Sequence, residues 1–182
     1  MKLAEVVETS LRVSEASGRL DKVDRLAALL ARTPAAEIEI ATAYLSGSLR
    51  QEKIGIAWAA LRSAMPEGGA DSSSLELAEV DAVFDRISKV SGKGSAAEKT
   101  RLLRELLVRA TPDEQRFLTG LVMGELRQGA LEGLVLEAVA KASGVPAGEV
   151  RRAWMMSGDL AVVAQTALVE GVAGLSRFST QL

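Results

Sequence analysis

Two stretches of this chain repeat each other. A shift of 77 positions places residues 26–51 on residues 103–128 without a gap, and ten of the aligned positions are identical. A shift of 74 positions likewise matches residues 3–6 to residues 77–80. Self-similarity of this kind is the signature of a repeated structural unit, so equivalent turns of the two copies are expected to present equivalent surfaces.

The repeated unit is predicted to be helical. Apolar residues recur every three or four positions instead of alternating, and the stripes within residues 20–31 and 102–110 are expected to face the core. We predict an all-α fold of about ten short helices in two pseudo-symmetric repeats. The larger apolar side chains are expected in that core as well: Tyr44, Trp58, Phe84, Phe117, Trp154, Met155 and Met156.

Two capping boxes predict where helices start. Thr111 is followed by Pro112 and by Glu114, which is the pattern of an N-cap hydroxyl, a proline at the first helical position and a glutamate at the third. Ser95 stands in the same relation to Glu98. Helices are therefore expected to begin near residues 112 and 96.

A polar segment rich in glycine and serine separates the repeats. Residues 66–74 have no apolar period and predict a flexible connection between halves at about residues 1–65 and 75–171. The domain is expected to span residues 1–171. The weakly patterned residues 172–182 are expected to begin a linker.

Composition excludes several classes of function. The chain has no Cys and no His, which removes common zinc sites, disulfides and Ser-His-Asp triads, and no metal site is expected. A carboxylate-dependent helical enzyme is disfavoured because no acidic pair stands at ligand spacing. No apolar run approaches 18 residues and the N-terminus is acidic, so we expect a soluble, cytoplasmic monomer without a membrane partner.

Charge is distributed unevenly along the chain. The net charge of −2 argues against a wholly basic nucleic-acid binder. Residues 63–85 nevertheless hold six acidic side chains and no basic one, whereas residues 86–109 hold seven basic and two acidic side chains. A basic run is also an ordinary solvated helix face, and that interpretation stays open.

The centre of the basic run suits an anion. Residues 91–95 read Ser-Gly-Lys-Gly-Ser directly before a predicted helix, where free N–H groups and the helix dipole favour a phosphate. The segment is not a Walker A loop, because Ile87 stands in place of its first glycine and Gly94 in place of its Ser/Thr. Nucleotide hydrolysis is therefore not predicted.

Three further turns combine a cation with permissive backbone. Arg19 and Lys22 flank a predicted helix start in the first half, and Arg50 follows Gly47. In the second half, Arg127 lies between two glycines that would let another backbone approach closely. Each turn alone is also an ordinary helix cap, but their recurrence at equivalent positions favours binding.

At these residues the chain resembles a known family. The runs SGKGS...K...LL, GELRQGALE.LVLEAVAKA and W..SGDLAVVA closely resemble the N-terminal DNA-binding domain of ATP-dependent DNA ligases. The resemblance implies an all-helical domain of two pseudo-symmetric halves that grips the minor groove on both sides of a nick. It implies the following DNA-binding residues: Arg19, Lys22, Arg50, Lys93, Gly94, Ser95, Lys99, Gly124, Arg127 and Gly129.

The first-half contact departs from the family pattern, because Glu52 and Lys53 replace the glycine expected after Arg50. Glu125 also stands where many relatives have a basic residue.

The family's catalytic signature, Lys-x-Asp-Gly, is absent from this chain. The resemblance implies a non-catalytic domain of a longer ligase whose adenylation domain uses ATP and magnesium to seal nicks in DNA repair, replication or recombination. Nicked double-stranded DNA and that adenylation domain would be its partners. The alternative is a helical-repeat module that binds proteins and not DNA.

Overall fold

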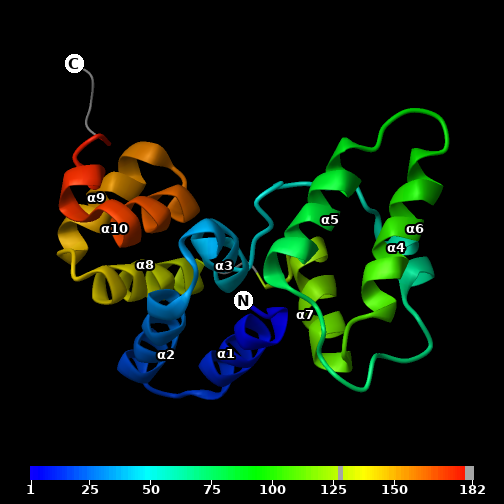
Figure 1. Cartoon of the computed structure of the whole chain (residues 1–182), viewed down its shortest axis with the longest axis horizontal. Helices are drawn as coiled ribbons and strands as arrows, with labels where there is room; N and C mark the ends of the chain where they lie inside the picture. Colours follow the sequence, from blue (N-terminus) through cyan, green and yellow to red (C-terminus); the bar gives the residue numbers. More distant parts are fainter. Residues whose placement is uncertain (127–128, 179–182) are drawn as a thin grey trace.

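The computed structural model describes residues 1–126 and 129–178, which fold into α-helices without a β-strand (Figure 1). The predicted all-α class is confirmed. In chain order the elements are α1 (Leu3–Glu15), α2 (Arg19–Arg32), the 3₁₀ helix η1 (Ala35–Glu37), α3 (Ile38–Leu45), α4 (Trp58–Ala64), α5 (Leu77–Lys89), α6 (Ser95–Val108), α7 (Pro112–Met123), α8 (Gly129–Ser143), α9 (Ala147–Ser157) and α10 (Leu160–Leu175). Within these residues, no helix combines the length and hydropathy needed to cross a membrane.

The helices form two lobes (Figure 1). In the first lobe α2 packs along α8, and α10 packs on α3, α8 and α9, with α1 beside α2. In the second lobe α6 packs on α4 and α5, and α7 lies beside α5 and packs on α1 of the first lobe. The chain therefore enters the second lobe at α4 and returns to the first at α8, so the lobes are not the two halves of the sequence.

Helices of matching length stand at the repeated positions. α1 and α5 each have 13 residues, and α2 and α6 each have 14. The pseudo-symmetry of the two repeats stays a prediction.

The predicted apolar stripes are mostly buried. Every apolar residue of the second stripe, from Leu102 to Ala110, that was expected in the core is buried there. In the first stripe Val23, Leu26 and Leu30 are buried, but Leu20 is 78% exposed and Ala31 at the other end of the stripe is exposed too. Leu20 lies in the first turn of α2, where the neighbouring helices no longer cover the apolar face.

Three aromatic side chains join the lobes. Tyr44 on α3 meets Phe84 on α5 and Phe117 on α7, with ring centroids 6.5 and 6.4 Å apart, and all three are buried as predicted. The prediction was wrong for Trp58, which is 55% exposed as the first residue of α4.

The methionines of α9 are also outside the core. Met155 is 76% exposed and Met156 is 44% exposed, contrary to the prediction. Val150 and Ala153 form the buried side of this helix, and at 3.6 residues per turn Met155 points to the opposite side. Trp154 is half-buried.

Both predicted helix starts are confirmed, but only one of the two predicted capping boxes forms. The Thr111 hydroxyl accepts from the N–H of Glu114, and the Glu114 carboxylate accepts from the N–H of Thr111 at 2.8 Å. α6 begins at Ser95 itself, and its N-cap is Gly94 in the left-handed region. Ser95 is already helical, so it cannot act as the cap that we predicted.

The segment between the repeats has no regular secondary structure, but hydrogen bonds attach it to the neighbouring helices. The N–H of Ala70 donates to the carbonyl of Ala110 at 2.9 Å, and the Gln115 amide donates to the carbonyl of Gly68 at 3.1 Å. The hydroxyl of Ser73 donates to the Glu114 carboxylate. These bonds hold residues 66–74 against the start of α7, and the flexibility of this connection stays a prediction.

The fold continues past Gly171. Gly171 interrupts the helical conformation of α10 with φ 65° and ψ −150°, but the helix resumes and Leu175 is completely buried. Arg152 donates to the carbonyl of Phe178 at 3.2 Å. Residues up to 178 therefore pack with the first lobe, and the rest of the predicted linker lies outside the described residues.

Candidate nucleic-acid interface

The start of α2 carries the first-half candidates. Arg19 donates to Glu137 on α8 at 2.7 Å, and this hydrogen bond raises the pKa of the guanidinium. Lys141 of α8 in turn pairs with Asp24 of α2. Lys22 makes no ion pair with any described residue. Arg19 is thus partly engaged in packing α2 on α8, whereas the Lys22 ammonium is available to a ligand.

One hollow brings candidate turns together. A cavity of about 220 Å³ is lined by Lys22 of α2, by Gly47 after α3, and by Leu126 and Ala130 on either side of the α7–α8 turn. The first-half helix start and the second-half turn therefore adjoin in the first lobe. Sequence spacing alone does not predict that these two places meet, because α8 returns from the second half to pack on α2.

The α7–α8 turn begins at a glycine that its conformation requires. Gly124 ends α7 with φ 71°, a left-handed conformation that residues with a side chain rarely adopt. Arg127 lies outside the described residues, and Gly129 is the first residue of α8. The candidate contact at Arg127 stays a prediction.

The α5–α6 turn is the candidate anion site in the second lobe. Gly92 and Gly94 both have positive φ, at 86° and 80°, and Lys93 between them is exposed without an ion-pair partner among the described residues. Among the described residues no side chain caps α6: the N–H of Ser95 donates to the carbonyl of Gly92 at 3.2 Å, and the N–H groups of Ala96 and Ala97 stay open. A lysine beside an uncapped helix start suits a phosphate.

Lys99 has a local role in the same region. Its ammonium donates to the carbonyl of Ile54 at 2.8 Å and so fastens the segment before α4 to α6. Lys99 can approach a ligand only from this tethered position.

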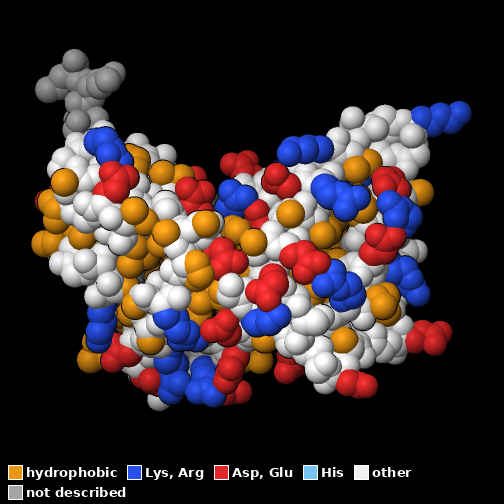
Figure 2. Space-filling view, viewed as in Figure 1, with side chains coloured by type: hydrophobic (Ala, Val, Ile, Leu, Met, Phe, Trp, Pro, Cys, Tyr) orange, Lys and Arg blue, Asp and Glu red, His pale blue; other side chains and the backbone are white. Residues whose placement is uncertain are grey.

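Two arginines of the basic run are paired with carboxylates of the protein. Arg101 pairs with Glu98 and Glu105, and Arg109 pairs with Glu79. These hydrogen bonds raise the pKa values of both arginines. Figure 2 accordingly shows basic and acidic side chains interspersed over this face instead of a single basic field. Lys93 in the α5–α6 turn differs from these two arginines because no carboxylate of the described residues pairs with it.

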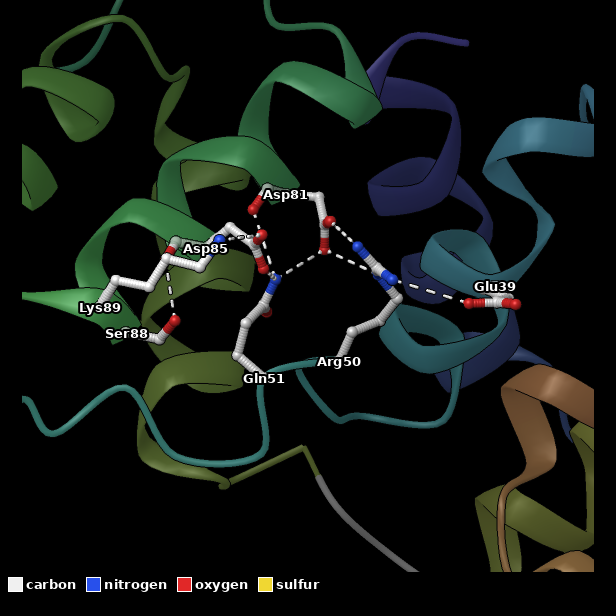
Figure 3. Close-up of polar contacts among 7 residues, drawn as sticks. All are labelled: Glu39, Arg50, Gln51, Asp81, Asp85, Ser88 and Lys89. Carbon is white, nitrogen blue, oxygen red and sulfur yellow. Dashed lines mark hydrogen bonds and ion pairs between the residues drawn. The ribbon is translucent and has the colours of Figure 1, made fainter.

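Arg50 lies between the lobes in a polar group that we call the interlobe cluster: Arg50, Gln51, Asp81 and Asp85 (Figure 3). Arg50 donates through Nε to Asp81 Oδ1 at 3.2 Å and through Nη2 to Asp81 Oδ2. The bonds to Asp81 raise the pKa of the guanidinium. Hydrogen bonds from Gln51 and then Lys89 lower the pKa of Asp85.

The sequence prediction missed Asp81, although a signal was present. Asp81 stands four residues after Leu77 and three before Phe84, and is therefore on the buried stripe of α5. A carboxylate at such a position needs a partner, because a buried charge is costly without one. The structure supplies that partner from the end of α3.

Comparison with known proteins decides the family. A family model described as DNA ligase N terminus matches residues 54–140. A protein named Probable DNA ligase from Anaeromyxobacter sp. (strain Fw109-5) is 51% identical over 183 residues, covering 100% of this chain and 35% of the relative. The chain belongs to the DNA ligase N-terminal family. The resemblance predicted from the sequence is thereby confirmed.

Other DNA ligase relatives agree. Proteins named Probable DNA ligase from Beutenbergia cavernae and Mycobacterium marinum are each 49% identical, and the matches cover 98% and 96% of this chain. They cover 35% and 34% of those relatives. The chain therefore spans about a third of the length of the DNA ligases that it matches.

Proposed function

We propose that this chain is the DNA-binding part of an ATP-dependent DNA ligase and that it grips the minor groove of nicked duplex without reading sequence. The observation that carries the proposal is the α5–α6 turn, in a chain of the ligase family. There Lys93, which pairs with no carboxylate in the described part of the chain, adjoins a helix start that no described side chain caps. Cations and open N–H groups bind phosphates of any sequence.

A second contact surface supports the same function. Lys22 and the α7–α8 turn lie together in the first lobe, and Gly124 lacks a side chain at the point where backbone would approach the groove. We include Arg19, Arg127 and Gly129 in this surface. A duplex that touches both lobes would be held at two places along its backbone.

The chemistry of nick sealing would belong to the rest of the protein. The chain contains no Lys-x-Asp-Gly motif, so its residues do not fit the attachment of an adenylate from ATP. The described residues also hold no group of three acidic side chains suited to a metal such as magnesium. Its role is to bind and position the duplex, as a monomer, for an adenylation domain of the same protein.

Competition for the two grooves tests the proposal. The chain should bind a labelled nicked duplex in fluorescence anisotropy, and a drug that fills the minor groove should displace it. Bulky substituents in the major groove should leave the affinity unchanged, because the minor groove carries the contact. Weaker binding to duplexes that carry the major-groove substituents, or absence of binding at low salt, would contradict the proposal and favour a protein-binding helical module.

Two arginine-to-alanine substitutions test the second contact surface, which is formed by Lys22 and the α7–α8 turn. Arg127→Ala should weaken duplex binding by about 1–2 kcal/mol, as expected for loss of a groove contact. Arg62→Ala, on α4 outside the candidate turns, is the matched control and should bind as the parent does. Equal affinities of the two variants would remove Arg127 from the interface.

A further inference from the structure

We infer that Arg50 is a positioning residue: with Gln51 it fixes the angle between the two lobes, and so sets the spacing of the two DNA-contacting surfaces. The inference rests on the proposed function, because it concerns how that interface is held together. It assigns Arg50 a role different from direct contact with DNA.

The interlobe cluster joins elements of different lobes (Figure 3). Arg50 and Gln51 follow α3 of the first lobe, and Asp81 and Asp85 lie on α5 of the second. Besides the two bonds from Arg50, the Gln51 amide donates to Asp85 Oδ1 at 2.9 Å and to Asp81 Oδ1 at 3.2 Å. Every one of these bonds crosses from one lobe to the other.

Two further attachments join the lobes: the buried side chains of Tyr44, Phe84 and Phe117, and a pair of backbone hydrogen bonds. The N–H of Leu3 donates to the carbonyl of Leu75, and the N–H of Leu77 donates to the carbonyl of Met1, both at 2.9 Å. These bonds tie the start of α1 to the start of α5, a point about which α5 could tilt. Together with the contact between Phe84 and Tyr44, the interlobe cluster holds α5 one to two turns further along and so opposes that tilt.

Burial makes the cluster a strong constraint. Asp81 is only 4% exposed, so its charge is stabilised by Arg50 and Gln51 instead of by water. Removing one partner of a buried pair is much more costly than removing a surface ion pair, because the other charge is left uncompensated. The arrangement is therefore expected to persist in solution.

The same geometry argues against a phosphate contact by Arg50. Its guanidinium already holds Asp81, and Glu39 lies 3.6 Å from Nη1. Asp85 adds a third carboxylate to this neighbourhood. Three acidic groups around one cation repel a phosphate, whereas Lys93 has no such neighbours among the described residues.

The variant Asp81→Asn distinguishes a positioning role of Arg50 from a direct contact of Arg50 with phosphate. If only charge mattered, removing a carboxylate would raise the affinity for DNA slightly. A positioning role predicts the opposite: duplex affinity should fall by about fivefold or more, within the usual range of coupling between sites, with the salt slope unchanged. Asp113→Asn is the matched control, since it removes one exposed carboxylate from α7 of the same lobe.

Exchanging the residues at positions 50 and 81 tests the positioning role of Arg50 without relying on the Asp81→Asn variant alone. The double variant Arg50→Asp/Asp81→Arg keeps an interlobe pair and should recover part of the affinity that each single variant loses. If Arg50 touched phosphate instead, the double variant would bind no better than Arg50→Asp, and Arg50→Ala would flatten the salt slope by about one unit. Either result would overturn the inference.

A distance measurement makes the test independent of DNA. The chain has no cysteine, so spin labels at Val108→Cys on α6 and Ala147→Cys on α9 would report only the distance between the lobes. Asp81→Asn should broaden the distribution of this distance. Gln51→Ala should broaden it more weakly, and because it keeps the Arg50–Asp81 ion pair it provides the test if Asp81→Asn does not fold. An unchanged distribution in folded variants would overturn the inference, even where the parent chain binds duplex normally.

Discussion

Tyr44→Phe is expected to stabilise the domain. The Tyr44 side chain is 1% exposed, and its hydroxyl has no hydrogen-bond partner among the described residues. An unpaired buried polar group of this kind costs about 1–3 kcal/mol. Phenylalanine keeps the ring contacts with Phe84 and Phe117 and leaves only a small void, so the variant should gain about 1 kcal/mol of unfolding free energy.

Urea unfolding at neutral pH measures this gain directly. In a chain of this size 1 kcal/mol corresponds to a rise of about 2–4 °C in Tm. A loss of stability in Tyr44→Phe would show that the hydroxyl has a partner in solution, such as a buried water, and would refute the reasoning.

The same variant has a characteristic pH dependence. Burial, and then the charge of Asp81, raise the pKa of the Tyr44 phenol well above its ordinary value. The folded state therefore keeps this proton after the unfolded chain has released it, so the contribution of Tyr44 to stability is present below about pH 10 and is lost as the pH rises further. The difference in free energy of unfolding between Tyr44→Phe and the parent chain should therefore grow between about pH 8 and pH 10.5. A constant difference would contradict the assignment.

Three further changes have expected outcomes. Thr111→Ala removes the hydroxyl that caps α7 and should cost about 1 kcal/mol in thermal or urea unfolding; no loss would show that the cap is dispensable. Lys93→Ala should weaken duplex binding and flatten the salt slope by about one unit, whereas Arg101→Ala, paired with Glu98 and Glu105, should change neither; equal effects would remove the α5–α6 turn from the interface. Incubation with labelled ATP and magnesium should leave the chain free of covalent nucleotide, and a lysine-linked adenylate would refute a purely DNA-binding role.

Local patterns predicted the helices well because helix periodicity and capping act over a few residues. The stripe from Leu102 to Ala110 and the capping box at Thr111 both formed as predicted. Leu20 and Met155 were assigned to the core wrongly, because burial depends on whether a neighbouring helix reaches that turn and that side.

The candidate site was less predictable for the same reason. The return of α8 onto α2 brings Lys22 beside the α7–α8 turn, and this contact joins residues about a hundred positions apart along the chain. Arg50 looked equivalent to Arg127 by repeat position. Its actual partner, Asp81, comes from a different lobe, and the spacing of the repeat holds no information on that contact.

The salt dependence of duplex binding tests the central claim most directly. With Arg50 held by Asp81, five candidate cations remain for phosphates: Arg19, Lys22, Lys93, Lys99 and Arg127. At about −0.9 per phosphate contact, the logarithm of the binding constant should fall against the logarithm of salt concentration with a slope of about −4 to −5. Permuting the base sequence should matter far less than doubling the salt. A slope near zero, or no binding at low salt, would contradict the proposal that this chain binds DNA.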